Sequence, residues 1–144
     1  IPDTEFTITH DYRQRPLLQQ MIRKALIQYG RAIQCGDMVL IEVSTLISSL
    51  LRVEDVFGRY GGEEFAIILP ETELRGAIDL AQRICNIIAT TALIYNKQAI
   101  NVTVSLGVAQ LSTEESNYEE LITQSDNALY QAKALGRNQV CSTA

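Results

Sequence analysis

The residues best suited to chemistry stand together in the segment 59–65, which reads Arg-Tyr-Gly-Gly-Glu-Glu-Phe. The two glycines would let a polyphosphate approach the backbone amides closely, because no Cβ intervenes. Glu63 follows them directly and is placed to ligate a hard cation such as Mg²⁺, which binds few carboxylates and keeps phosphate oxygens as further ligands. A plain surface hairpin with an acidic tip would have the same sequence, so this segment alone leaves both interpretations open.

A pair of cations lies near the other end of the chain. Lys133 and Arg137 are four residues apart near the end of a predicted helix, so they could converge on one anion. Alternatively, both could simply stabilise the negative end of the helix dipole. The net charge of −5 argues against a general nucleic-acid binder, which needs a basic stripe. It still allows one small phosphate ligand held by local cations and metal ions.

The elements that must position these residues alternate between helices and hairpins. Apolar residues at helical spacing predict a helix over 17–26 and a second helix that Asp37 could cap, with an apolar stripe over 39–50. Residues 56–60 and 65–69 predict two strands with the glycines between them. Two glycines suit a tight hairpin, because primed turns need positive φ at both central residues.

The second half of the chain continues this alternation. Gly136 is expected to cap the last helix, and alternating valines and Leu106 over 102–108 are typical of a half-buried strand. Together the elements predict an α+β fold with a central mixed, mostly antiparallel sheet flanked by helices. The expected elements are a helix over 73–90, hairpin arms over 92–95 and 99–111 about Asn96-Lys97, a helix over 118–135 and a strand over 139–141.

Several motifs together resemble the GGDEF family, in the family's order and spacing over roughly residues 34–140. The central segment resembles the family signature in the form Gly61-Gly62-Glu63-Glu64-Phe65. Because several motifs in register are far more specific than one, the chain is identified as a member with the family's palm-like nucleotidyl-cyclase fold. The other motifs are Gly36-Asp37, which resembles the start of the second helix, Asn101–Val108, the core strand, and Asp126–Asn138, the C-terminal helix signature.

The resemblance implies a diguanylate cyclase, which condenses two GTP molecules to cyclic di-GMP and two pyrophosphates. Each GTP would be held by one subunit of an antiparallel homodimer, with Mg²⁺ or Mn²⁺ as cofactor. Phosphoryl transfer suits such a site, since it needs mainly positioning and cancellation of charge. The implied roles are a metal ligand and base for the 3′-hydroxyl at Glu63, nucleotide contact at Gly61 and Gly62, a guanine acceptor at Asp37, triphosphate binding at Lys133 and Arg137, and metal contact or support of the hairpin at Glu64.

A second motif precedes the hairpin. Arg52-Val53-Glu54-Asp55 resembles the family's R-x-x-D inhibitory motif, five residues before Gly61, and Arg83 resembles an arginine that completes this product site in some members. A guanidinium can stack on guanine and bind its O6/N7 edge, while a carboxylate accepts from N1 and N2. The alternative is a surface charge cluster between a helix and a strand.

The resemblance is interrupted at two places. Family members carry a buried strand with a metal-binding Asp, and an Asn that reads guanine, where this sequence passes directly from Ile33 to Gln34. The usual turn after Asp11 is also absent. As written, the site has one metal carboxylate where the mechanism needs two. We expect further residues in the polymer between Ile33 and Gln34 and near 12–13; a chain that has lost the strand would favour an inactive receptor.

The expected organisation is a linker over 1–12 from an upstream sensory domain, followed by the GGDEF domain over 13–144. The chain has no initiator Met and reads as a fragment of a longer protein. No apolar run approaches the roughly 20 residues of a membrane helix, and no signal peptide is evident. Three widely spaced cysteines suit a reducing cytosol, so a cytoplasmic location is expected.

Two functions from different classes remain open: an active cyclase with product inhibition, and a catalytically inactive GGDEF domain that binds cyclic di-GMP at Arg52 and Asp55 and regulates a partner. GTP turnover would distinguish them. A third hypothesis is a cyclase that makes a different dinucleotide, which would appear as the product in assays with mixed ATP and GTP.

Overall fold

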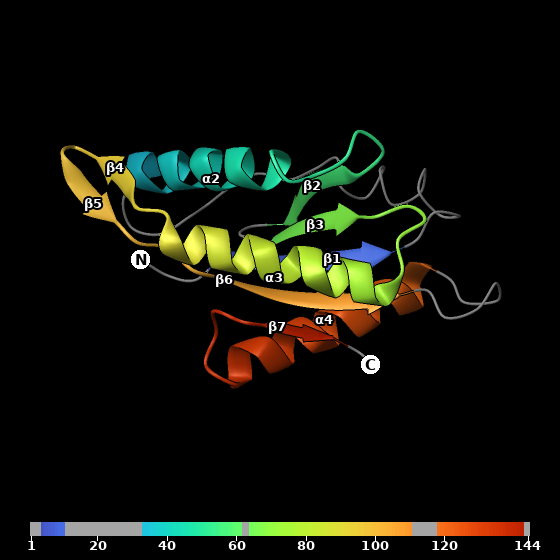
Figure 1. The fold of residues 1–144 in the computed structure, drawn as a ribbon. Helices are drawn as coiled ribbons and strands as arrows, with labels where there is room; N and C mark the ends of the chain where they lie inside the picture. Colours follow the sequence, from blue (N-terminus) through green and yellow to red (C-terminus); the bar gives the residue numbers. More distant parts are fainter. Residues whose placement is uncertain (1–3, 11–32, 62–63, 111–117, 143–144) are drawn as a thin grey trace.

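The structure, a computed structural model, describes residues 4–10, 33–61, 64–110 and 118–142 (Figure 1). Helices and strands alternate through these ranges, and the described strands form a five-stranded sheet and a separate two-stranded hairpin. The elements are β1 (Thr4–His10), α2 (Ile33–Ser48), β2 (Val56–Gly61), β3 (Glu64–Ile68), α3 (Leu74–Thr90), β4 (Leu93–Tyr95), β5 (Gln98–Ile100), β6 (Val104–Gln110), α4 (Tyr118–Ala134) and β7 (Val140–Ser142).

The five-stranded sheet has the order β2-β3-β1-β6-β7. The pair β2–β3 is antiparallel, while β3–β1, β1–β6 and β6–β7 are parallel. The predicted mixed sheet is therefore confirmed, but the expectation that it is mostly antiparallel is wrong. The reason lies in the connections: α3 separates β3 from β6, α4 separates β6 from β7, and a helical crossover returns the chain to the same edge of the sheet.

Helices cover both faces of the sheet, as Figure 1 shows, which agrees with the predicted α+β class. The main core lies under α2 and α3, where Val43, Ile84 and Leu106 are fully buried. On the opposite face, α4 packs Leu121 against Ile68 and Ala109. No helix in the described ranges is long and apolar enough to cross a membrane.

Strand β6 is buried on both faces, which corrects the expectation of a half-buried strand over 102–108. Val104, Leu106 and Val108 enter the main core, and the small residues between them lie under α4. At Gly107 an added Cβ would lie 2.2 Å from the Ser125 carbonyl oxygen. Glycine therefore lets the backbones of α4 and β6 approach more closely than any side chain would allow.

The two predicted hairpins are present, with shifts in their bounds. Gly61 is the last residue of β2 and Glu64 the first of β3, so the connection is 62–63 and not 61–62 as the glycine pair suggested. Asn96 and Lys97 have φ of 50° and 65°, which joins β4 to β5 by a primed turn. The predicted arm 99–111 divides into β5 and β6.

Two expectations for the first part of the chain are corrected. Residues 4–10, assigned to a linker, form the central strand β1, because β3 and β6 pair with it on both sides. Helix α2 begins at Ile33 and runs on through Gln34. The expectation that the polymer carries further residues between them stays a prediction. Asp37 lies inside α2 and does not cap it, because the helix begins four residues earlier, at Ile33. Gly36 weakens a helix only mildly, so the helix continues through it.

Candidate functional site

The Gly-Gly-Glu-Glu segment lies at the tip of the β2–β3 hairpin. Gly61 ends β2 and Glu64 begins β3, while Gly62 and Glu63 lie outside the described residues. The hairpin is fastened behind its tip, because the rings of Phe57 and Phe65 stack with centroids 5.5 Å apart. This end of β3 is therefore held by the core, where Phe65 is buried.

The predicted cation pair lies at the end of α4, but the two residues are not on one helix face. Helix α4 ends at Ala134, Gly136 has a φ of 119°, and Arg137 and Asn138 follow with φ of 65° and 49°. The Arg137 amide donates to the Ala132 carbonyl and the Gly136 amide to the Lys133 carbonyl, at 3.0 and 3.2 Å. This is the Schellman arrangement, so the predicted Gly136 cap is confirmed and the helical i,i+4 argument for Arg137 is wrong.

The sheet register places the hairpin tip and the α4 turn at one edge of the sheet. Glu64 and Ser105 both pair with Glu5, and Val140, which follows the α4 turn, pairs with Leu106. The first residues of β3 and β7 therefore lie at nearly the same level. Three strand spacings separate them, about 14 Å at roughly 4.8 Å each.

Asp37, the predicted guanine acceptor, lies in the first part of α2. Its backbone lies in the second turn of α2, and its side chain is outside the described part of the structure. Figure 1 shows that α2 begins at the end of the molecule where β4 and β5 lie and runs toward the start of β2. Strand β2 then runs back in the opposite direction.

The predicted metal ligands are Glu63 and Glu64. Within the ranges that the structure describes, no three His, Cys, Asp or Glu side chains gather as a metal site, and Glu63 lies outside them. The donors themselves fit a hard divalent cation, because Mg²⁺ and Mn²⁺ prefer carboxylate oxygens.

The opposite end of the hairpin carries Arg52 and Asp55, which close a tight turn. The Asp55 amide donates to the Arg52 carbonyl at 3.0 Å, and the Arg52 amide donates to Asp55 Oδ2 at 2.7 Å. Both bonds need a separation of three residues, which explains why Arg-x-x-Asp closes this turn. Val53 and Glu54, between them, face solvent.

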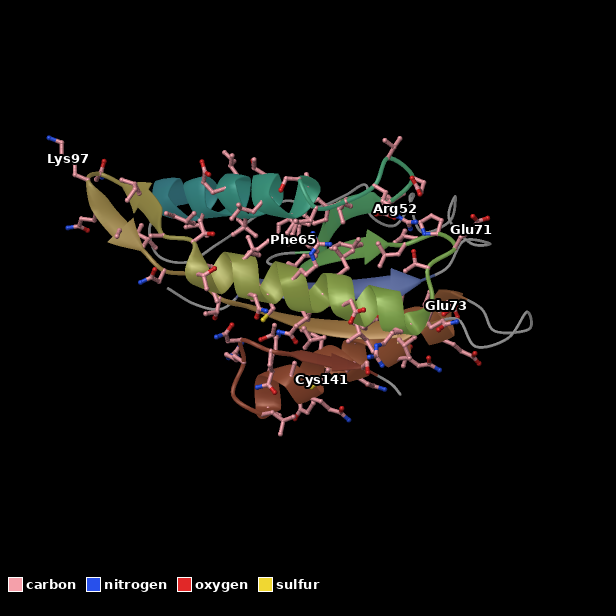
Figure 2. The ribbon with its side chains drawn as sticks, viewed as in Figure 1. Arg52, Phe65, Glu71, Glu73, Lys97 and Cys141 are labelled. Atoms are coloured by element: carbon pink, nitrogen blue, oxygen red, sulfur yellow. The ribbon has the colours of Figure 1, made fainter. Side chains whose placement is uncertain are left out.

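The Arg52 guanidinium turns back onto this turn and onto the loop after β3 (Figure 2). Its Nη2 lies 3.2 Å from Asp55 Oδ1, 3.1 Å from the Pro70 carbonyl oxygen and 2.5 Å from Thr72 Oγ1. Its Nη1 forms an ion pair with Glu54 at 3.3 Å. The Asp55 side chain is only 2% exposed, and its carboxylate holds the Arg52 guanidinium in this folded-back conformation.

Arg83, from the exposed face of α3, completes the surroundings of Arg52. A hollow of about 200 Å³ opens beside Arg52 and Asp55 and is also lined by Arg83, Thr72 and Gly76. Pockets that enclose a whole drug-sized ligand measure roughly 300–1,000 Å³. This hollow suits one end of a larger anionic ligand, with two guanidinium groups at its rim.

Pro70 and Thr72 were not singled out from the sequence. They lie 18 and 20 residues from Arg52, and no local pattern links them to it. Only the antiparallel pairing of β2 with β3 brings the loop after β3 beside the turn before β2.

Comparisons with known proteins identify the family and the fold of this chain. Residues 27–139 match the family described as "Diguanylate cyclase, GGDEF domain". Diguanylate cyclase A of Treponema denticola is 38% identical over 112 residues, which is 78% of this chain and 30% of that protein. The chain thus spans less than a third of the length of this curated relative.

Two solved structures share the fold. The active GGEEF domain of a diguanylate cyclase from Vibrio cholerae is 28% identical with a TM-score of 0.68, covering 92% of this chain and 77% of that one. The GGDEF domain of DgcB from Caulobacter crescentus, in complex with c-di-GMP, is 28% identical with a TM-score of 0.71, covering 76% and 65%.

Proposed function

The chain belongs to the GGDEF family of diguanylate cyclase domains, and on that premise we propose that it condenses two GTP molecules to cyclic di-GMP and two pyrophosphates. One observation carries the proposal: the sheet register brings the Gly-Gly-Glu-Glu hairpin and the Lys133–Arg137 turn to one edge of the sheet. A triphosphate between them would meet backbone amides and carboxylates on one side and cations on the other.

Each residue at this edge has a defined task. Lys133 and Arg137 would hold the triphosphate, Asp37 would accept from the guanine, and Glu63 would hold Mg²⁺ or Mn²⁺ and take the proton of the attacking 3′-hydroxyl. Glu64 contacts the metal or supports the hairpin. The metal, when bound, neutralises charge that develops as the oxygen–phosphorus bond forms and pyrophosphate leaves.

Cyclic di-GMP needs two GTP molecules joined head to tail, whereas this edge offers a site for one. We therefore propose that a homodimer brings two such edges together. We also propose that a sensory domain controls this encounter. The chain spans less than a third of the length of the Treponema denticola relative.

The opposite end of the hairpin is proposed as a product site for cyclic di-GMP. Arg52 and Arg83 at the rim of the hollow support this role, because guanidinium groups bind both the guanine edge and phosphate. The relative from Caulobacter crescentus was solved in complex with c-di-GMP. Binding here would reduce turnover at the other end of the domain.

The test is turnover of GTP with Mg²⁺ by the full-length protein, with dinucleotide and pyrophosphate both measured. Formation of cyclic di-GMP and two pyrophosphates per product would support the proposal. Binding of cyclic di-GMP without any turnover would instead establish the second candidate, a receptor, which is favoured by the well-formed Arg52–Asp55 turn.

A further inference from the structure

The loop Pro70–Thr72, directly after β3, forms a second wall for the Arg52 guanidinium. Glu71 has a φ of 55°, a left-handed conformation that is uncommon for a residue with a side chain. This bend places the Pro70 carbonyl and the Thr72 hydroxyl side by side, and both contact the same nitrogen, Nη2 of Arg52.

The hydroxyl of Thr72 has a fixed direction. Its single proton is donated to the Pro70 carbonyl oxygen at 3.2 Å, so its lone pairs are left to accept from Arg52 Nη2. A serine could make the same two bonds, whereas valine has the same shape and can make neither.

The methyl group of Thr72 is fixed as well. A Cβ at Gly76 would lie 3.1 Å from Thr72 Cγ2, which is tighter than an ordinary contact. Gly76 is the third residue of α3, a place where glycine weakens a helix relative to alanine. The absence of a side chain there leaves room for the Thr72 methyl and for the hollow that both residues line.

The two ends of the guanidinium are held unequally. Nη2 contacts the buried Asp55 carboxylate, the carbonyl of the buried Pro70 and the hydroxyl of the half-buried Thr72. Nη1 contacts Glu54, whose side chain is 48% exposed. An exposed ion pair is weak and easily exchanged. Nη1 is therefore the end from which an anionic or guanine ligand can displace a protein group.

We infer that Thr72 is a positioning residue of the product site: it holds Nη2 of Arg52 so that the guanidinium is already fixed beside the hollow before ligand arrives, and Nη1 is left in its exchangeable pair with Glu54. The inference rests on the proposed product site and adds a residue to it. A flexible arginine that is fixed in advance loses less conformational entropy on binding, so affinity rises without a direct contact between Thr72 and the ligand.

The experiment compares Thr72→Val with Thr72→Ser in the full-length protein, by calorimetric titration with cyclic di-GMP. We expect Thr72→Val to weaken binding about tenfold, the lower end of the usual effect of one hydrogen bond to a charged group. Thr72→Ser should stay within about twofold of the wild type by the same reasoning. GTP turnover measured before product accumulates should be unchanged in both variants.

Gly76→Ala provides a second, independent perturbation. Its Cβ should push Thr72 away from Arg52 and weaken cyclic di-GMP binding, although alanine favours the helix. Adding Thr72→Ser removes the methyl that the new Cβ meets, so the double variant should regain the lost affinity. Such rescue would not occur if Gly76→Ala merely damaged the fold.

The outcomes separate the inference from its premise. If the wild type binds cyclic di-GMP and Arg52→Ala does not, while Thr72→Val and Gly76→Ala bind like the wild type, Thr72 has no positioning role. If the wild type itself binds no cyclic di-GMP, the product site fails, and the inference fails with it.

Discussion

The two ends of the β2–β3 hairpin are built in different ways. The Arg52 end is a turn whose main bonds join residues three apart, with one added wall from the loop after β3. At the tip end, the sheet register brings the start of β3 and the strand that follows the α4 turn to one edge of the sheet. Figure 2 shows Arg52 at the end of β3 that leads to Glu71.

This difference predicts which substitutions should affect only one end of the hairpin and which should affect both. A six-residue strand such as β2 is about 20 Å long. Residues at the two ends of the hairpin are therefore too far apart to contact each other, although both ends belong to the same sheet. Substitutions at either end should therefore affect that end alone, whereas substitutions in the shared scaffold should affect both. The predictions below test this separation.

Glu63→Gln should have the largest effect and should be confined to the tip. Removing a charge from a metal site is expected to lower GTP turnover about 100-fold or more. Cyclic di-GMP binding at the Arg52 end should stay unchanged in a titration of the same protein. Glu119→Gln, on the exposed first turn of α4, is the matched control. Turnover above about one tenth of the wild-type rate would remove Glu63 from catalysis.

Gly107→Ala should reduce both GTP turnover at the hairpin tip and cyclic di-GMP binding at the Arg52 end, because it destabilises the sheet and helix on which both ends depend. The new Cβ would lie 2.2 Å from the Ser125 carbonyl oxygen and 2.3 Å from the Leu129 amide nitrogen, so α4 must move away from β6. We expect the free energy of unfolding to fall by about 3 kcal/mol, toward the upper part of the range for overpacked cores. Urea denaturation followed by circular dichroism measures it; an unchanged midpoint would show that α4 can shift freely.

Arg52→Ala should weaken cyclic di-GMP binding and relieve product inhibition. A guanidinium–guanine contact is worth on the order of 1–3 kcal/mol, about 5- to 150-fold in affinity. Initial GTP turnover, before product accumulates, should match the wild type because the tip is untouched. Arg75→Ala, on the exposed first turn of α3, provides the control. Equal product affinity in both variants would reduce the Arg52 turn to surface electrostatics.

Glu54→Gln should have the smallest effect, in the opposite direction. Its carboxylate pairs with Arg52 Nη1 at the exposed side, where it competes with an anionic ligand. Loss of such a pair is worth a few tenths of a kcal/mol, so product affinity should rise about twofold at low salt. The gain should shrink as salt increases, because exposed charges are screened. Weaker binding than in the control Glu42→Gln, on the exposed side of α2, would mean that Glu54 assists the ligand.

The sequence by itself determined the elements whose signals are local. The helix over 73–90, the primed turn at Asn96-Lys97 and the Gly136 cap all follow from periodicity or from a backbone conformation that few residues adopt. The Arg52–Asp55 pair belongs here too, because a separation of three residues lets a turn bring the pair together. The family itself was recognisable from motifs in register.

Only the tertiary structure decided the features that depend on distant partners. Residues 4–10 have no strong local signal and become a strand because β3 and β6 offer unpaired edges on both sides. The side-chain oxygen of Gln110, at the end of β6, accepts from the Leu74 amide at the start of α3, where Glu73 supplies no cap. Arg52 meets Thr72 only through the β2–β3 pairing. Such contacts join residues that are far apart in the chain. They could not be predicted from the sequence, because the spacing of apolar residues indicates only the local conformation of residues that are close in sequence.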